Sequence, residues 1–351
     1  MIPIANPQMG PEEREAVDRV LQSGIIAQGP EVAKFEEEFA KYTGTKFAIS
    51  VSSGNAALQL SLIGLGIKQD SKVITTTNSF IASANCIKMV GAEPILCDIH
   101  SDDGNMNIKT TDEKPDAIIP VHIYGNPCDF DSVKSFADEQ NIPIIEDACQ
   151  AHGAEYKGKK VGSLGDVGCF SFYPTKNMTV GGDGGMTTTD NEEIVLKIKS
   201  IRDNGRKTKN EFDKLGFTMR LNTVNAAIGR VQLKHLDEKT ARRREIVSVY
   251  RKNLVQDCIL PENKDGKSVY HQIVIKHKKR DEIRKELADN DIGSAIYYET
   301  PIHKQPIYQE FGYELPNSEK FSKEIMSLPS YPQLTDEQAL EICEHVNKII
   351  G

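Results

Sequence analysis

Short apolar runs and longer amphipathic stretches alternate along the first half of the chain. The apolar runs have the length and residue types of buried strands and cover residues 47–51, 72–76, 93–97, 116–121, 142–147, 168–172 and 185–189. The amphipathic stretches place apolar residues at helical spacing and cover residues 11–22, 31–43, 55–64, 81–90 and 129–140. This alternation indicates βαβ units, so we expect an α/β fold with a central, mostly parallel sheet.

The pattern changes in the second half of the chain. A long helix with a charged middle is predicted first, and shorter helices and strands follow it, over residues 222–256, 269–275, 280–290, 295–298, 318–326 and 336–350. This mixture predicts a smaller α+β unit after the α/β unit. We therefore expect a large domain over residues 1–235 and a small C-terminal domain over residues 236–351, with the boundary inside the long helix.

Charge and composition narrow the possible partners. The 351 residues carry a formal net charge of −8, and the pI is near 5.6. The basic run Arg242-Arg243-Arg244 is closed by Glu245 within a predicted helix, which is typical of a solvated helix face. These features argue against nucleic acid and an anionic membrane as partners. No apolar run approaches the roughly 20 residues that span a bilayer, and no signal-peptide pattern opens the chain, so we expect a cytoplasmic protein.

The cysteines support a reducing compartment. There are seven of them, an odd number, and no Cys-x-x-Cys pair occurs. Several lie in apolar runs, where a free cysteine behaves as a small hydrophobic residue. We therefore expect free thiols, with no disulfide framework and no metal site.

Two residues carry the most specific chemical signal. Asp147 ends the apolar run 142–147, and Lys176 lies in a turn just before a glycine-rich stretch. Lysine can form a Schiff base with the aldehyde of pyridoxal phosphate (PLP), and a carboxylate can keep the pyridine nitrogen protonated. Each residue alone has an ordinary alternative, since Asp147 could cap the next helix and Lys176 could be a solvated loop lysine.

Further candidates follow other predicted strands, where ligands bind in open α/β sheets. The strand-to-helix turn with Gly54, Asn55 and Ala56 offers backbone N–H groups to a phosphate, although a plain capped helix has the same pattern. Phe80 follows the strand at 72–76 and could stack on a flat cofactor, although it could equally be a core residue.

The order of these motifs resembles the DegT-like family of sugar aminotransferases, which are PLP enzymes of fold type I. The resemblance extends from Ile2 to the C-terminus, and it includes the segments at 23–30, 54–56, 120–125, 146–154, 171–177, 225–229, 301–303 and 328–329. It implies that Lys176 is the Schiff-base lysine and that Asp147 pairs with the pyridinium nitrogen.

The same resemblance implies how the rest of the cofactor is held. Gln150 would contact the ring hydroxyl, and Phe80 would stack on the ring. Ser171 and the amides of residues 54–56 would hold the phosphate. The segment 216–220 would reach the phosphate from a partner subunit, so Thr218 is a cofactor candidate and a homodimer is expected.

The implied reaction is a ping-pong transamination in which Lys176 also moves the proton. Glutamate is the expected donor, and the expected acceptor is a nucleotide-linked keto-sugar, a 4-keto-6-deoxyhexose, because the opening segment and residues 23–30 resemble the 4-aminating members. Substrate contacts are expected from Tyr173, Arg220, Tyr297, Tyr298 and His303. Arg202, Arg206 and Arg220 are basic candidates for a diphosphate, with ordinary surface arginines as the alternative.

The chain departs from the family pattern at four places. Asn55 stands where threonine is usual, Tyr173 where histidine is frequent, and Thr218 where asparagine normally reaches the phosphate. Tyr297-Tyr298 replaces a common His-Tyr pair. These differences surround the phosphate and the substrate, which indicates an unusual substrate or subfamily.

Three other functions are alternatives to sugar transamination, and the sequence argues against each. A PLP-dependent sugar dehydratase of the same fold would have histidine in place of Lys176. A non-catalytic regulator of the same family would have no use for a Schiff-base lysine beside Asp147. An NAD-binding Rossmann domain would show Gly-x-Gly-x-x-Gly after its first strand, and this chain does not.

Overall fold

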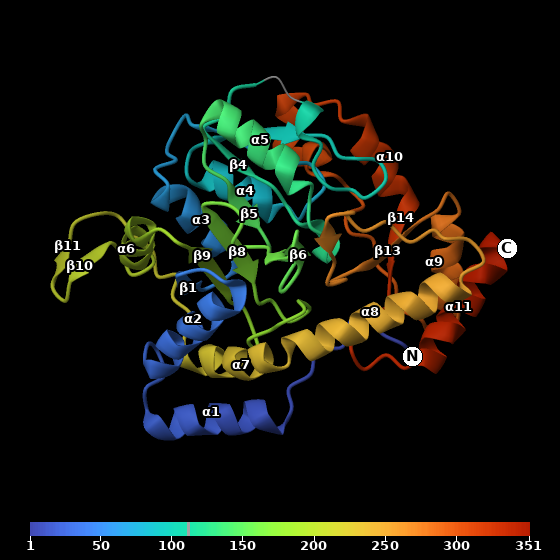
Figure 1. Ribbon diagram of the computed structural model, residues 1–351, viewed down its shortest axis with the longest axis horizontal. Helices are drawn as coiled ribbons and strands as arrows, with labels where there is room; N and C mark the ends of the chain where they lie inside the picture. The colour runs from blue at the N-terminus through green and yellow to red at the C-terminus, as the bar shows by residue number, and fades with distance from the viewer. Residues whose placement is uncertain (111–112) are drawn as a thin grey trace.

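A central sheet organises the computed structural model, which describes residues 1–110 and 113–351 (Figure 1). Its strands are β1 (Phe47–Val51), β2 (Lys72–Thr76), β3 (Glu93–Cys97), β4 (Ala117–Ile119), β5 (Ile145–Asp147), β8 (Val167–Ser171) and β9 (Gly185–Thr189). They pair in the orders β3-β2-β4 and β1-β9-β8-β5, and two parallel bridges, Ile118–Ile144 and Val121–Asp147, join β4 to β5. Only β9 runs antiparallel to its neighbours, so the expected mostly parallel sheet is confirmed.

Helices cover this sheet and continue into the C-terminal part. They are α1 (Pro11–Ser23), α2 (Pro30–Thr43), α3 (Gly54–Gly64), α4 (Ala82–Met89), α5 (Phe130–Gln140), α6 (Glu192–Ile201), α7 (Thr223–Lys234), α8 (Leu236–Asn253), α9 (Arg280–Asp289), α10 (Pro316–Glu324) and α11 (Asp336–Ile350). Helix α3 is buried on nearly every side, because it packs against β8, β9, α4 and α6. Its apolar residues and those of β1, β2 and β8 share one core.

The C-terminal part has a core of its own. Strands β13 (Ile273–Lys276) and β14 (Ile325–Leu328) pair antiparallel, and residues of α8, α9 and α11 pack with them. Ile2 joins the same core, and its backbone exchanges hydrogen bonds with Asp291 and Gly293 over 2.9 and 2.7 Å. The N-terminal segment therefore crosses to the C-terminal part before α1 begins.

Short elements complete the chain. They are strands β6 (Glu155–Tyr156), β7 (Lys159–Lys160), β10 (Arg206–Thr208), β11 (Glu211–Phe212) and β12 (Gly266–Lys267), and 3-10 turns at Ile108–Thr110, Ile123–Gly125, Ile302–Lys304 and Pro306–Phe311. The β10–β11 hairpin extends away from the rest of the molecule beyond α6 (Figure 1).

Three expectations about elements need correction, and one helix was not expected at all. The helix predicted over residues 222–256 is two helices, α7 and α8, which meet at His235, where the backbone leaves helical geometry. Residues 295–298 do not form a strand, since only Ala295 bridges to Ser327. The predicted helix at 318–326 ends at Glu324, because the buried run 325–328 pairs with β13 instead. Helix α6 was not predicted.

Two further observations bear on the environment of the protein. All seven cysteines are free thiols, as expected. Within residues 1–110 and 113–351, no helix has the length and apolar character needed to cross a bilayer.

Candidate active site

Asp147 lies at the carboxyl end of β5 and is only 4% exposed. Its Oδ2 accepts a hydrogen bond from the Ser83 hydroxyl over 2.7 Å, and its Oδ1 accepts one from the Cys149 backbone over 3.2 Å. The Ser83 hydroxyl is also 2.7 Å from that of Ser79. A buried carboxylate is tolerated only with such partners, so this network fixes the position of Asp147.

The preceding residue, Glu146, points to the other side of the strand. Its two carboxylate oxygens accept backbone hydrogen bonds from Gly162, Leu164 and Gly165 over 2.7–2.8 Å. Its Oε2 is also 3.0 Å from Nε2 of His122, and both side chains are fully buried. Because successive side chains of a strand face opposite ways, Glu146 anchors a loop while Asp147 faces the site.

Lys176 lies in the turn after β8. Its backbone N–H donates to the Tyr173 carbonyl over 2.9 Å, and the next residue, Asn177, donates to the Val269 carbonyl over 3.0 Å. Burial lowers the pKa of the Lys176 ammonium, while the neighbouring Cys149 and Asp147 side chains act in the opposite direction. A lowered pKa increases the neutral amine fraction, which is the nucleophilic form.

His152 is buried close to Lys176. Its ring lies 5.4 Å from that of Phe170 and 5.7 Å from that of Phe172. Burial and the charge of Lys176 lower the pKa of His152 to about 3, so the imidazole is neutral at physiological pH. Within the described part of the chain, neither ring nitrogen has a hydrogen-bond partner.

Gly54 opens helix α3 at a point where three segments meet. A Cβ on Gly54 would lie 2.7 Å from the Cβ of Ser171 and 2.8 Å from the sulfur of Cys149, so only glycine fits. The Ser53 side chain caps the helix by accepting from the Ala56 amide over 3.1 Å. The amides of Gly54 and Asn55 have no partner inside the helix, which suits an anion.

Aromatic side chains form the wall on the α4 side. Phe80 is 56% exposed, and its ring lies 6.0 Å from that of Tyr298. Gln150 is buried, and its amide accepts from the Tyr124 backbone over 2.8 Å and donates to the Tyr298 hydroxyl over 3.2 Å. The Tyr124 hydroxyl donates to the Tyr297 carbonyl over 2.5 Å. The structure therefore brings Phe80, Gln150, Tyr297 and Tyr298 together.

Other predicted residues have partners elsewhere. Tyr173 is 52% exposed beside the Lys176 turn. Thr218 is exposed and donates to Asn204 over 3.1 Å, and Arg220 forms an ion pair with Asp203 at 2.5 Å. His303 is buried, and its ring nitrogens lie 2.6 Å from the Thr77 hydroxyl and 3.3 Å from the Glu319 carboxylate.

The arginines considered for a diphosphate also have carboxylate partners. Arg202 is buried and forms an ion pair with Glu36 at 2.7 Å, and its guanidinium also donates to the Ser50 carbonyl. Arg206 pairs with Asp203 at 3.0 Å. Arg202 is thus a structural residue that ties α2 to β1.

Sequence reasoning missed Ser83 and Tyr124. Ser83 lies on α4, three positions after Phe80, and the only signal was a polar residue on the first turn of a helix that follows a strand. Tyr124 lies within the resembling segment 120–125, but the resemblance gave it no role. Both act through contacts between segments far apart in the chain, which spacing alone does not reveal.

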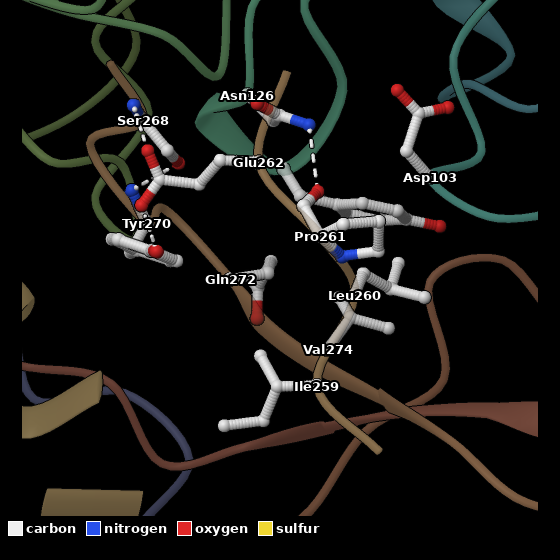
Figure 2. Close-up of a pocket in the computed structure, with 11 residues that line it drawn as sticks. Asp103, Asn126, Ile259, Leu260, Pro261, Glu262, Ser268, Tyr270, Gln272 and Val274 are labelled. Carbon is white, nitrogen blue, oxygen red and sulfur yellow. Dashed lines mark hydrogen bonds between the residues drawn. The ribbon is translucent and has the colours of Figure 1, made fainter. Parts of the chain in front are cut away.

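A separate small cavity lies next to Tyr124. It has a volume of about 20 Å³ and is lined mainly by the segment 259–274 (Figure 2). Glu262 lies beside Ser268 and Tyr270 at one end, and Asp103 lies at the other (Figure 2). Neither Lys176 nor Asp147 lines it, so it is not part of the predicted site.

These residues fit bound PLP. One end of the sheet gathers a partly buried lysine with a lowered pKa, a buried carboxylate, a glycine position with no room for a Cβ, and an exposed phenyl ring. Among the residues that the structure describes, no group of histidine, cysteine or acidic side chains could hold a metal ion.

Comparisons with known proteins agree with this fit. The sequence profile of the DegT/DnrJ/EryC1/StrS aminotransferase family matches residues 7–347. The chain is 38% identical to the pleiotropic regulatory protein of Geobacillus stearothermophilus, over 97% of this chain and 94% of that protein. It is also 38% identical to the dTDP-3-amino-3,6-dideoxy-alpha-D-galactopyranose transaminase of Aneurinibacillus thermoaerophilus, over 96% and 95% of the two chains.

A solved structure has the same fold. DesV of S. venezuelae, determined in complex with a ketimine intermediate, superposes with a TM-score of 0.93 at 35% identity, and the match covers 96% of this chain and 94% of that one. The expected fold type I transferase architecture is therefore confirmed. The chain belongs to the DegT/DnrJ/EryC1/StrS aminotransferase family, and it is an aminotransferase whose cofactor is pyridoxal phosphate.

Proposed function

We propose that this protein transfers the amino group of glutamate to a nucleotide-linked keto-sugar, specifically a 4-keto-6-deoxyhexose. One observation carries the proposal. Lys176 is partly buried with a lowered pKa, and it lies close enough to Asp147 for that carboxylate to act on its charge. Relatives named as dTDP-sugar transaminases, at 36% and 38% identity, support the acceptor class.

The proposed roles follow from the surroundings of each residue. PLP, when bound, supplies an electron sink for the substrate carbon that loses its proton. Asp147, held by Ser83, would keep the pyridine nitrogen protonated. The Lys176 amine would take the proton from Cα of the donor and later deliver one to the keto carbon of the sugar. A positioned base of this kind typically contributes roughly 10²–10⁴-fold.

Cofactor binding would use the start of α3. The Gly54 and Asn55 amides and the Ser171 hydroxyl would hold the phosphate, while the Ala56 amide is already used by Ser53. Gln150 would meet the ring hydroxyl, and Phe80 would lie against the ring face. Thr218 is exposed, so it would contact the phosphate only from a second subunit.

Substrate selection is proposed for the aromatic wall. Tyr173, Tyr297 and Tyr298 would contact the sugar. Arg220 would meet the diphosphate only if it exchanged its partner Asp203, and His303 would need to leave Thr77 and Glu319. We therefore propose the three tyrosines as the main sugar contacts.

The two half-reactions would follow one another at one site, with 2-oxoglutarate released before the sugar binds. An absorbance spectrum of the purified, PLP-loaded protein tests this order. Glutamate alone should remove the visible band, and the keto-sugar should restore it.

Lys176→Ala should lose turnover and keep its fold by circular dichroism, and full activity in that variant would overturn the assignment. Parallel assays with 3-keto and 4-keto nucleotide sugars decide which carbon is aminated.

A regulatory function is the second candidate, because one relative at 38% identity is named a pleiotropic regulatory protein. The spectrum separates the two functions. Protein that remains colourless after PLP is added would favour regulation by binding alone.

We also propose the remaining organisation of the protein. It would be a homodimer with shared sites, located in the cytoplasm, where its seven free thiols would stay reduced. The chain would divide at His235, between α7 and α8, into residues 1–235 and 236–351.

A further inference from the structure

A second polar cavity is lined by the Lys176 turn and not by helix α3. It has a volume of about 50 Å³, and residues 174–177 form one wall. The other walls come from α7 and α8, from the N-terminal segment 4–8, and from two stretches of the C-terminal part that include His271 and Ser330. The cavity therefore joins the reacting lysine to parts of the fold that have no assigned role.

Arg243 of α8 brings a buried positive charge to this cavity. It is 6% exposed, and its Nη1 donates to the Ser330 hydroxyl over 3.1 Å. Burial lowers the pKa of its guanidinium to about 10. Within residues 1–110 and 113–351, its Nε has no hydrogen-bond partner and no carboxylate forms an ion pair with it. A buried charge without a counter-charge is costly, so the site favours an anion.

Lys239 and His271 extend the same wall. The Lys239 ammonium donates to Gln232 over 2.6 Å, and burial lowers its pKa, while Glu13 acts in the opposite direction. Glu13 is engaged with Gln232 and with the backbone of Gly10, over 2.6 and 2.7 Å. His271 is 6% exposed, and among the described residues its Nδ1 has no partner.

The charges of this wall act on one another. The pKa of His271 is held well below its usual value by burial first, and then by the positive charges of Lys176 and Arg243. His271 therefore lies within electrostatic reach of both the reacting lysine and the buried guanidinium. Three cationic side chains line one small cavity, and no carboxylate does.

We propose that this cavity is an anion subsite that takes the distal carboxylate of the amino donor. A carboxylate there would accept hydrogen bonds from Arg243 and Lys239 while the reacting end of the donor lies at Lys176. The volume exceeds the roughly 10–15 Å³ that one water requires. The inference rests on the proposed function for the identity of the donor, but not for the existence of the subsite.

Calorimetric titration of the PLP-loaded protein tests the subsite without turnover. Glutarate, butyrate and inorganic phosphate serve as probes, and bound PLP occupies the cofactor phosphate site. Glutarate should bind to the parent protein. Its affinity should fall roughly 10- to 100-fold in Lys239→Met and in Arg243→Gln, the usual loss for a hydrogen bond to a charged group. Butyrate should bind weakly to all of them.

The matched control is Lys234→Met. Lys234 is exposed at the end of α7 and does not line the cavity, so this variant should bind glutarate like the parent. Lys239 is only partly buried, so Lys239→Met keeps the test open if Arg243→Gln fails to fold.

Each outcome decides the proposal. No glutarate binding to the parent, or unchanged affinity in a folded Lys239→Met, would overturn it. Phosphate that binds as tightly as glutarate, with the same loss in the variants, would make this a free-anion site and overturn the donor assignment.

A second measurement separates this inference from the proposed donor. In single-turnover spectra, Lys239→Met should need a roughly 10- to 100-fold higher glutamate concentration for half-maximal rate and should treat L-alanine like the parent. If glutamate fails with the parent protein while glutarate binds at the cavity, the proposed donor is wrong and the subsite stands.

Discussion

Burial lowers the pKa of two basic side chains at the candidate site. The same loss of solvent that lowers the pKa of Lys176 keeps His152 neutral beside it. The position of the Asp147 carboxylate is held by two hydrogen-bond donors, the Ser83 hydroxyl and the Cys149 amide. The lowered pKa of Lys176 therefore comes from burial, whereas the position of Asp147 comes from hydrogen bonds, and each can be tested separately.

Ser83 is the first such test. In Ser83→Ala, Asp147 loses its 2.7 Å hydroxyl donor and is free to turn away from the cofactor ring. We expect the glutamate half-reaction to slow roughly tenfold or more, the usual scale for losing a hydrogen bond to a charged group. Ser83→Thr keeps the hydroxyl and should restore the rate. A Ser83→Ala protein that reacts at the parent rate would show that the Cys149 amide suffices.

His152 should make the protein less stable in acid. Its pKa is lowered to about 3 in the fold and is near 6.5 in the unfolded chain, so below pH 6.5 the unfolded state binds the extra proton. Stability is then lost as the pH falls from about 6.5 toward 3, by about 2 kcal/mol between pH 7 and pH 5 for this group. Urea titrations of PLP-free protein measure the loss.

The matching variants isolate that group. His152→Leu should lose about 2 kcal/mol less than the parent over the same pH range, whereas His100→Gln, at an exposed site, should follow the parent. Equal pH dependence in the parent and in His152→Leu would contradict the assignment.

At this scale the sequence predicts part of the site. Lys176 and Asp147 stand next to recognisable turns, so local pattern and a family resemblance suffice to propose them as site residues. Ser83 and Arg243 reach their partners, Asp147 and Ser330, only in the folded chain. Neither stands in a sequence motif that predicts this contact. His303 stands in a motif, yet Thr77 and Glu319 hold both its nitrogens.

Helix α3 packs on the sheet and begins at the residues proposed to bind the phosphate. Gly54, its first residue, has the least room for a larger side chain. Gly54→Ala would place a methyl group 2.7 Å from Ser171 and 2.8 Å from Cys149. We expect a loss of about 1–3 kcal/mol in unfolding free energy and weaker PLP binding, measured by thermal unfolding and by cofactor titration.

Gly64→Ala, in the same helix, is the control. There a new methyl group would meet side chains alone, those of Ile198 at 3.1 Å and Ile194 at 3.5 Å, and the stability should stay within about 1 kcal/mol of the parent. Similar PLP affinities for both variants would mean that crowding at Gly54 does not reach the phosphate.

Helices and strands can be predicted from the sequence where the periodicity of apolar residues is strong. The prediction fails where tertiary contacts override that periodicity. All seven strands of the central sheet were expected close to their observed positions. The α7–α8 junction was not, because His235 is neither proline nor glycine and the helical pattern continues through it. Residues 325–328 continue a helical pattern but pair with β13, which buries all four of them.

At the scale of the whole molecule, the β10–β11 hairpin is where the proposed second subunit would pack. It extends from the body (Figure 1), and Phe212 on β11 and Leu215 just after it are 54% and 96% exposed. We expect sedimentation to give twice the chain mass of 39.0 kDa. Leu215→Glu should shift the protein toward the monomer, because a charge at an apolar interface is costly.

Val255→Glu is the matched control for that experiment. Val255 is 64% exposed but lies after α8, in the C-terminal part, so the change should leave the dimer intact. A monomeric parent protein would contradict the shared site and with it the proposed role of Thr218.

The opposed acids of β5 have a consequence for how the protein tolerates insertions. Glu146 and Asp147 face opposite sides, so shifting the strand by one residue would exchange them. The loop would then lose its anchor at the same moment as the proposed partner of the pyridine nitrogen left the site. An insertion in this strand should therefore lower stability and activity together.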